Sequence, residues 1–561
     1  MGMVSAGHHL AASAGHEMLA NGGNAIDAGV AAGLVVNVVH HDMTNFGGVA
    51  PIIIRSAETD RVHTISGVGR WPRSASREFF ETEFDGAIPR GITRSVVPGA
   101  PDAWITALRD HGRLSFAEVA APAIRFAREG YPVYEFQRYN MKKQYERANL
   151  HSSTLDAVFP HGRPPAVGEI LTQRALADTL ERMAEEEQRC GDRESGLDAA
   201  RDYFYEGPIA RKIDEFSRER GGLIRKSDLA DFTVQTEPPV HVEFGDYDVF
   251  TCGPWCQGPV LAQSLNIAEE RSIQELEHNS PEYLHLLIEV LKLAFADREW
   301  YYGDPDTVDV PIDELVSERY TQQRAEEVSM ETAHPELPPP GITNSVAPDP
   351  FDLSGLARDP EELGGPTQDT SYVAAIDDEG NVFSATPSDS WHQSPIVPEL
   401  GIVVSGRGSQ SRLDPRHPNS LEPWKRPRLT PNPALVLKDG EPYMALGTPG
   451  GDVQPQAMVQ VLLNHVVFGM SVQQAIEAPR VATYSHPASF TPHQYYPGTV
   501  MAEARLPAET FAALEEKGHR PFSWPSVAYR AGGVNVVTRN PETGVLEAGA
   551  DFRRGNYAVG E

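Results

Sequence analysis

Basic residues are scarce in this chain, and the shortage argues against one large class of functions. The 561 residues include 48 Lys and Arg against 79 Asp and Glu, which gives a formal net charge of −31. Only eight of the basic residues are Lys. A surface of this kind repels phosphate backbones instead of neutralising them, so we expect no nucleic-acid partner.

Cysteines and long apolar runs are also few. Cys190, Cys252 and Cys256 form neither a CxxC pair nor a zinc pattern, and an odd number is typical of a reducing compartment rather than of a disulfide framework. The most apolar run near the start, residues 25–39, contains polar residues and is too short to span a bilayer. The opening residues lack the basic patch and apolar core of a secretion signal. We therefore expect no membrane partner and a cytoplasmic location.

Several familiar catalytic motifs are missing as well. The sequence contains no Walker loop, no HExxH zinc motif and no GxSxG nucleophile elbow. His40-His41-Asp42 lacks the further cluster of ligands that a metal site would need, so a loop of polar residues is the better interpretation. We predict no metal and no cofactor.

The most informative segment present begins at Gln368-Asp369-Thr370. Residues 372–376 and 382–386 alternate as strands on either side of a turn at 377–381, which predicts a β-hairpin directly after Thr370. A cut before Thr370 would give this residue a free α-amine beside its own hydroxyl. Such an amine, with an ordinary pKa of about 7.7 to 8.0, can accept the hydroxyl proton near pH 7. Taken alone, a threonine that merely opens a strand is the commoner interpretation.

Two further segments suit that chemistry. Residues 331–367 are rich in Pro, Gly and acids without periodicity, which predicts an exposed connector upstream of Thr370. Residues 447–452 form a glycine turn between a predicted strand and a helix. The N–H groups of Gly450 and Gly451, reinforced by the helix dipole, could hold an oxyanion, although a plain tight turn is the alternative.

Periodicity predicts the elements around these segments. Helices are expected at 11–20, 25–39, 171–187 and 280–301, with a capping box from Ser115 to Glu118, and residues 115–274 are mostly helical in pattern. Strands are expected at 51–54, 401–404, 434–437 and 443–446.

Taken together these residues resemble the γ-glutamyltranspeptidases, a family of N-terminal nucleophile hydrolases, over nearly the whole chain. The matching segments are 22–28, 97–100, 296–298, 303–306, Thr370 with its hairpin, 425–427, 448–451 and 475–480. The resemblance implies an α+β fold, a four-layer αββα sandwich. It also implies self-cleavage between Asp369 and Thr370 into a mainly helical large chain, 1–369, and a small chain, 370–561, which together form one domain and a heterodimer. Further dimerisation is left open.

The resemblance also assigns catalytic roles. It implies acyl transfer through Thr370, with Ser388 positioning the nucleophile and Gly450 and Gly451 matching the oxyanion-hole glycines of the family. The substrate would be a small-molecule amide or γ-glutamyl compound, and the acceptor would be water or an amine.

The residues that would recognise a glutamyl group depart from the family pattern. Val68 stands where the family has an arginine, with Arg70 two positions later, and Gln410 stands where it has an aspartate. Because a buried ammonium without its charged partner costs a few kcal/mol, glutathione is not expected to be the best substrate. Other replacements are Ser388 and Ser390 for Thr and Asn, and Leu429-Thr430 for a serine pair.

Segments 407–415 and 450–456 resemble a glutathione hydrolase-like branch of the same superfamily. Within that branch we hypothesise that Arg70 and Arg407 jointly bind a substrate carboxylate, since guanidinium groups suit carboxylates. The equally good alternative is that each arginine is a structural ion-pair partner. Ser390, Gln410 and Thr430 complete the predicted substrate-binding set.

Two classes of function follow from the sequence. The favoured one is an autoprocessed amidase or acyltransferase that hydrolyses or transfers a γ-glutamyl or related acyl group through an acyl-Thr370 intermediate. The alternative is an uncleaved, catalytically silent relative that acts as a binding or scaffolding protein.

Overall fold

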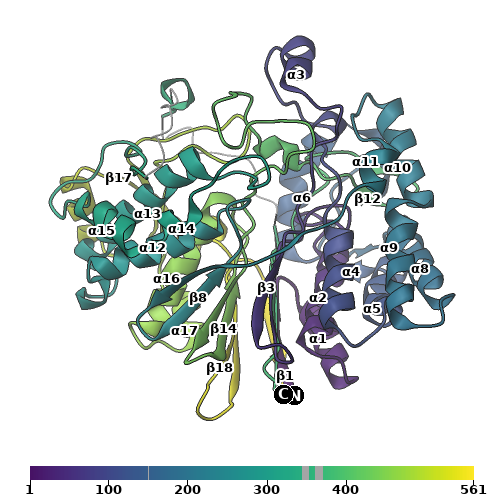
Figure 1. Cartoon of the computed structure of the whole chain (residues 1–561), viewed down its shortest axis with the longest axis horizontal. Coiled ribbons are helices and arrows are strands. Elements are labelled where there is room, and N and C mark those ends of the chain that lie inside the picture. Colours follow the sequence, from purple (N-terminus) through teal and green to yellow (C-terminus); the bar gives the residue numbers. More distant parts are fainter. Residues whose placement is uncertain (149–150, 344–352, 360–369) are drawn as a thin grey trace.

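In the computed structural model, two β-sheets face each other and helices cover the outer face of each (Figure 1). The structure describes residues 1–148, 151–343, 353–359 and 370–561. The α+β class and the four-layer αββα sandwich implied by the resemblance are confirmed. Apolar clusters fill the space between each sheet and its helices, and a smaller cluster that includes Ile53, Tyr372 and Leu435 fills the space between the sheets.

The first sheet contains the hairpin predicted after Thr370. Its seven described strands, in spatial order, are β20 (Tyr557–Gly560), β1 (Gly2–Ala6), β9 (Val373–Asp377), β10 (Val382–Ala385), β2 (Ile52–Ser56), β3 (Arg61–Ile65) and β6 (Thr236–Glu237). The carboxylate of Asp377 accepts a hydrogen bond from Asn381 N at 2.9 Å, and Gly380 takes a φ of 91° that favours glycine. In this strand order the hairpin β9–β10 has strands on both sides, so it lies inside the sheet.

The second sheet is built mainly from residues after 370. Its six described strands are β19 (Leu546–Ala550), β18 (Asn535–Arg539), β14 (Glu441–Gly447), β13 (Ala434–Lys438), β8 (Tyr247–Thr251) and β7 (Val240–Phe244). The last two lie in a stretch expected to be mostly helical. The strand expected at 401–404 is only β12 (Ile402–Val403), which pairs with β11 (Ile396–Val397) outside both large sheets.

Helices on the first sheet come from the first half of the chain. The helix predicted at 25–39 is confirmed as α2, all of whose residues are buried, and the Asn24 side chain caps it by accepting from Ile26 N and Asp27 N. Gly29 is needed in α2 because a Cβ there would lie 2.0 Å from the ring of Phe383 in β10. The helices of this layer and the segments around it are α1 (His9–Ala20), α2 (Ala25–Val39), α3 (Arg77–Phe84), α4 (Ala100–His111), α5 (Phe116–Glu129), α6 (Glu135–Ala148), α7 (Ser152–Val158), α8 (Arg174–Gln188), α9 (Arg193–Tyr205), α10 (Pro208–Glu219) and α11 (Lys226–Ala230).

The helices predicted in this layer are present, and two of them start at other residues than expected: the helix expected at 11–20 begins at His9. The capping box from Ser115 to Glu118 is present at the start of α5. The helix expected at 171–187 begins at Arg174, because Leu171 belongs to β5 (Ile170–Leu171), which pairs with β4 (Tyr131–Pro132).

The second sheet is covered by α12 (Gly258–Glu270), α13 (Pro281–Tyr301), α16 (Gln454–Val466) and α17 (Val472–Glu477) (Figure 1). Beyond them lie α14 (Ile312–Leu315), α15 (Glu318–Glu326) and α18 (Ala508–Glu516), with a small sheet of β15 (Val481–Thr483), β16 (Thr499–Glu503) and β17 (Arg520–Trp524). No helix in the described ranges is both long and apolar enough to cross a bilayer.

Segments on either side of residue 370 are interleaved in both sheets. In the first sheet β9 and β10 lie between β1 and β2, and in the second sheet β8 pairs with β13. The two ends of the chain meet in the first sheet, where β1 pairs with β20 and Gly2 N donates to Glu561 O at 3.3 Å (Figure 1). Much of the connector predicted at 331–367 falls outside the described residues.

Candidate active site

Thr370 lies three residues before the start of β9 and is almost completely buried, with 1% of its surface exposed. Its Oγ1 atom is 2.8 Å from Ser388 Oγ. Ser388 is in turn held by paired backbone hydrogen bonds to Val49, at 2.9 and 3.3 Å. The predicted nucleophile and its predicted positioning residue are therefore in contact, and an isolated β-bridge to Val49 holds Ser388.

Arg407 lies at the other side of the Ser388 hydroxyl. It begins a short 3₁₀ turn, residues 407–410, is buried, and its guanidinium donates a hydrogen bond to Ser388 Oγ. Because a guanidinium can only donate, Ser388 Oγ accepts this bond and can give its own hydrogen to Thr370 Oγ1. The contact with Arg407 uses one lone pair of Ser388 Oγ and leaves the hydroxyl hydrogen available for Thr370 Oγ1.

Asp389, which the sequence did not single out, stands next to this pair. It is fully buried and takes a φ of 95°, a conformation in which a residue other than glycine is strained. Its carboxylate accepts a hydrogen bond from Ser405 Oγ at 2.6 Å and lies 4.0 Å from Arg407 Nε. Burial raises the pKa of Asp389, and the charge of Arg407 opposes that rise.

The glycine turn predicted at 447–452 joins β14 to α16. Gly450 and Gly451 have φ values of 142° and 60°, both in the range that favours glycine. Neither N–H group donates to any residue that the structure describes. Gln257 fixes the turn from behind, because its Nε2 donates to Gly451 O at 2.8 Å and to Thr430 O at 2.9 Å.

The other predicted substrate-binding residues fall into separate groups. Gln410 and Thr430 bind each other, with Gln410 Nε2 donating to Thr430 Oγ1 at 3.1 Å and Thr430 N donating back to Gln410 Oε1 at 3.0 Å. Ser390 is buried and contacts His392 Nδ1.

Arg70 lies in an ion-pair network apart from Arg407. It donates to Asp306 at 2.5 Å and to Asp304 at 3.3 Å, and it contacts neither Thr370 nor Arg407. Arg426 also binds Asp304, at 2.8 Å. These contacts agree with the alternative that Arg70 is a structural ion-pair partner. Arg70 and Arg407 have no partner in common among these contacts, so their joint binding of a substrate carboxylate stays a prediction.

The predicted polar loop at 40–42 is a buried turn after α2. Trp391 Nε1 donates to His41 Nδ1 at 3.1 Å, and burial lowers the pKa of His41 to about 4. Burial also raises the pKa of Asp42 to about 7.

The one group with metal-ligand spacing within the described ranges lies elsewhere, at His285, Glu289 and His519. His285 Nδ1 and His519 Nε2 are 2.8 Å apart, and Lys292 donates to Glu289 at 2.7 Å. The Lys292 ammonium already supplies the positive charge, which disfavours a metal ion there.

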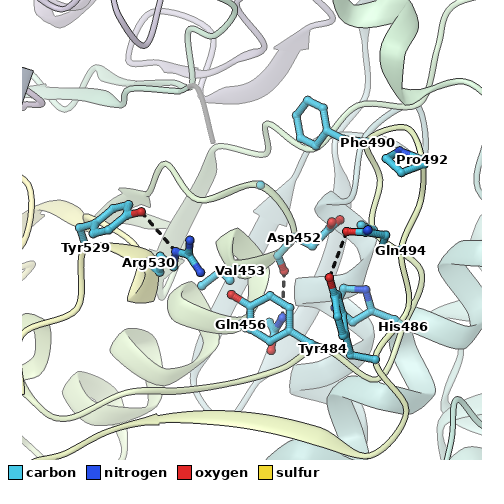
Figure 2. Close-up of a pocket in the computed structure, with 13 residues that line it drawn as sticks. Asp452, Val453, Gln456, Tyr484, His486, Phe490, Pro492, Gln494, Tyr529 and Arg530 are labelled. Carbon is cyan, nitrogen blue, oxygen red and sulfur yellow. Dashed lines mark hydrogen bonds between the residues drawn. The ribbon is translucent and has the colours of Figure 1, made fainter. Parts of the chain in front are cut away.

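A cavity with aromatic walls adjoins the glycine turn (Figure 2). We call it the aromatic cavity. Gly451 is one of its lining residues, and the side chains of Tyr484, Phe490, Tyr496, Tyr529 and Arg530 also line it, among others. The guanidinium of Arg407 lies 5.3 Å from the centre of the Phe490 ring. The Phe490 wall of the cavity therefore lies next to the Arg407 guanidinium, which donates to Ser388 Oγ.

Comparison with known proteins places the chain in two steps. The four-layer sandwich defines the class as the N-terminal nucleophile hydrolases, which the structural neighbours share. The chain belongs to the γ-glutamyltranspeptidase family, whose model, described as Gamma-glutamyltranspeptidase, matches residues 11–561. Members of this family are amide hydrolases and acyl transferases, and this chain is an enzyme of that kind.

Its relatives carry several different names. It is similar to the "Glutathione hydrolase-like YwrD proenzyme" of Bacillus subtilis, with 33% identity over 565 residues covering 100% of this chain and 98% of the relative. It is 31% identical to "Acylase ACY 1 proenzyme" of Pseudomonas sp., covering 98% and 92%. A crystal structure of cephalosporin acylase from Bacillus halodurans superposes with a TM-score of 0.86 at 30% identity, covering 100% and 95%.

Proposed function

We propose that this chain cuts itself between Asp369 and Thr370 and then hydrolyses an amide through an acyl-Thr370 intermediate. The observation that carries the proposal is the 2.8 Å contact between Thr370 Oγ1 and Ser388 Oγ, buried at the head of a central strand. The relatives named proenzymes support processing of the chain into residues 1–369 and 370–561.

Self-cleavage would use the same hydroxyl as catalysis. Thr370 Oγ1 attacks the carbonyl carbon of Asp369, the C–N bond to Thr370 breaks, and the nitrogen takes up the hydroxyl proton to become an amine. The resulting ester is hydrolysed by water, which leaves a carboxylate on Asp369 and restores the Thr370 hydroxyl. The freed amine is the only general base that the reaction then needs.

In turnover the Thr370 amine would accept the hydroxyl proton while Oγ1 attacks the substrate carbonyl. The oxyanion that forms would accept hydrogen bonds from the N–H groups of Gly450 and Gly451, which donate to no described residue. The amine passes the proton to the leaving nitrogen as the C–N bond breaks, and water then hydrolyses the acyl ester.

Arg407 and Ser388 would stabilise the attacking oxygen. The guanidinium donates to Ser388; with Ser388 donating in turn to Thr370 Oγ1, positive charge would be transmitted to the atom that becomes negative as its proton leaves. Asp389 holds Arg407 in place from its other side.

The substrate is proposed to be a γ-glutamyl or related acyl compound, with acyl groups that lack a free α-ammonium preferred. At the position where the family has an aspartate, Gln410 forms a neutral, buried pair with Thr430. A neutral amide attracts an ammonium less than a carboxylate does. Glutaryl and succinyl amides are therefore expected to react faster than γ-glutamyl amides.

Intact mass spectrometry tests the central step. Wild-type protein is expected to give two fragments that meet at residues 369 and 370, whereas T370A remains one chain and shows no activity. T370S serves as the matched control, because it keeps the hydroxyl and the amine and should be cut. A wild-type chain that stays whole after long incubation would contradict the proposal and favour a silent binding protein.

A further inference from the structure

The aromatic cavity has features of a binding site that the cleavage chemistry does not use. It shares Gly451 with the turn proposed to hold the oxyanion, and Tyr484, Phe490 and Tyr529 supply ring surfaces to its walls (Figure 2). Flat aromatic walls suit a flat apolar ligand, because stacked or edge-on rings add to the gain from burial.

Arg530 brings positive charge to the wall of this cavity. Arg530 Nε donates to Tyr529 OH at 3.2 Å, Arg554 Nε donates to Tyr529 O at 2.9 Å, and Lys143 Nζ lies 3.4 Å from the same hydroxyl. The carboxylate in the cavity wall, Asp452, is already paired with Arg298 at 2.5 Å. In a chain with a net charge of −31, the Arg530 guanidinium in the cavity wall favours an anionic ligand, and Lys143 and Arg554 lie near Tyr529 outside the lining.

A buried histidine adds a hydrogen-bond acceptor. His486 lines the cavity, is 3% exposed, and stacks on Phe295 with ring centres 3.9 Å apart. Its Nδ1 faces Pro487 O at 3.2 Å, and its Nε2 has no hydrogen-bond partner in the described parts of the chain. With Nδ1 as donor, Nε2 is an acceptor. Leaving such a buried atom unpaired costs free energy, so a ligand N–H or O–H fits here.

We propose that the aromatic cavity binds a planar, acidic portion of the amide substrate, with its ring against Tyr484 and Phe490 and its carboxylate toward Arg530. This inference rests on the proposed function, because the cavity adjoins the scissile amide only if Gly451 holds the oxyanion. A carboxylate on a flat ring matches the rings and the cations, and a ring amine or amide N–H matches His486 Nε2. The ligand class is therefore an aromatic amino acid of the aminobenzoate type, or its amide.

Calorimetric titration with 4-aminobenzoate tests this site without requiring turnover. Processed wild-type protein is expected to bind 4-aminobenzoate about tenfold more tightly than neutral 4-aminobenzamide, because a charged hydrogen bond is lost with the neutral ligand. R530Q should lower the affinity for 4-aminobenzoate about tenfold and leave that for 4-aminobenzamide unchanged. F490A should lower the affinity for both ligands. The matched control is R539Q, because Arg539 lies on β18 and pairs with Glu441.

The outcomes separate this inference from the proposed function. Equal affinity for the two ligands, or an R530Q variant that binds like wild type, would overturn the cavity assignment even if the chain is processed and active. Binding of 4-aminobenzoate to a chain that stays uncut would keep the cavity assignment and overturn the cleavage proposal.

Steady-state kinetics of R530Q with two kinds of amide then show whether the ring belongs to the acyl group or to the leaving group. If the leaving group occupies the cavity, R530Q should lower kcat/KM for glutaryl-4-aminobenzoate but not for glutaryl-methylamide. If the acyl group occupies it, the loss should appear instead with the monoamide of terephthalic acid. Loss in neither series would contradict the proposal.

Discussion

At the scale of single residues, the direction of the hydrogen bonds around Ser388 decides how Thr370 can react. Arg407 can only donate, so the Ser388 hydroxyl keeps its hydrogen available for Thr370 Oγ1, and in the proposed arrangement it donates there and does not compete for the Thr370 proton. The Thr370 hydroxyl hydrogen is then left for the amine that cleavage would create. A neighbour that accepted from Thr370 would favour the wrong direction of proton transfer.

Replacement of Arg407 by methionine should therefore slow the chemical step more than it weakens binding. We expect R407M to lower kcat about 10- to 100-fold, the effect of one charge-assisted hydrogen bond in the transition state, with KM changed less. Steady-state kinetics of processed protein on a glutaryl anilide would measure this.

The control is S409A, two residues along the same turn. The Ser409 hydroxyl is buried and has no hydrogen-bond partner among the described residues, so its removal should leave kcat unchanged. If R407M raised KM alone, Arg407 would bind substrate, as first hypothesised, and would not act on the nucleophile.

Only part of this site could be predicted from the sequence. Thr370, Ser388 and the two glycines stand at positions that a motif can mark, because each is tied to a local turn or strand end. The ion pairs of Arg70 could not be predicted, since its partners Asp304 and Asp306 lie more than two hundred residues away. The strained φ of Asp389 has no sequence signal at all, because glycine is the residue that usually marks such a conformation.

At the scale of elements, close contact between α2 and β10 supports the hairpin that carries Thr370. The absent side chain of Gly29 lets the helix approach the ring of Phe383, which is fully buried. An alanine at this position would gain up to about 1 kcal/mol in helix propensity. Its Cβ, however, would lie 2.0 Å from a ring that is fully buried.

We expect the steric cost to exceed that gain. G29A should lower the free energy of unfolding by about 1 to 3 kcal/mol, the usual cost of overpacking a core, and lower the melting temperature measurably. G191A is the matched control, because nothing lies within 4 Å of a Cβ there. A G29A chain as stable as G191A would mean that the helix shifts without cost.

Elements with a clear local pattern were predictable, and those defined by pairing were less so. The helices at 25–39 and 280–301 and the hairpin after Thr370 have long or well-bounded patterns, and they match α2, α13 and β9–β10. The strands β7 and β8 were missed, although Val240–Phe244 alternates and a glycine turn at Gly245 follows it. The helical pattern of the flanking segments set the prediction for that region. The two strands join a large sheet only because β8 pairs with β13, nearly two hundred residues later in the chain.

At the scale of the whole molecule, buried neutral histidines connect stability to pH. Burial lowers the pKa of His41, His417 and His486 to about 4 each, against an ordinary value of 6.5. Between about pH 4 and 6.5 the unfolded chain therefore binds more protons than the folded one, so stability falls as the pH drops. Asp42 acts in the opposite sense, because burial raises its pKa to about 7. The stability that the protonated Asp42 carboxyl contributes is therefore lost as the pH rises toward 7.

With three histidines against this one carboxyl, acid should destabilise the protein. Each histidine is expected to cost up to about 2 kcal/mol at pH 5, and the melting temperature should fall steadily between pH 7 and pH 5. H41Q should reduce this fall, since a glutamine oxygen can still accept from Trp391 without taking up a proton. A melting temperature that stays constant over this range would contradict the prediction.

The meeting of the two chain ends beside each other in the first sheet allows a circular permutation. Because Gly2 and Glu561 exchange backbone hydrogen bonds, a short loop could join the last residue to the first without disturbing β1 or β20. A rearranged gene whose product starts at Thr370 and finishes at residue 369 would then build the same sandwich with its amine present from synthesis. In such a permutant maturation and catalysis become separable, because the enzyme would need no zymogen.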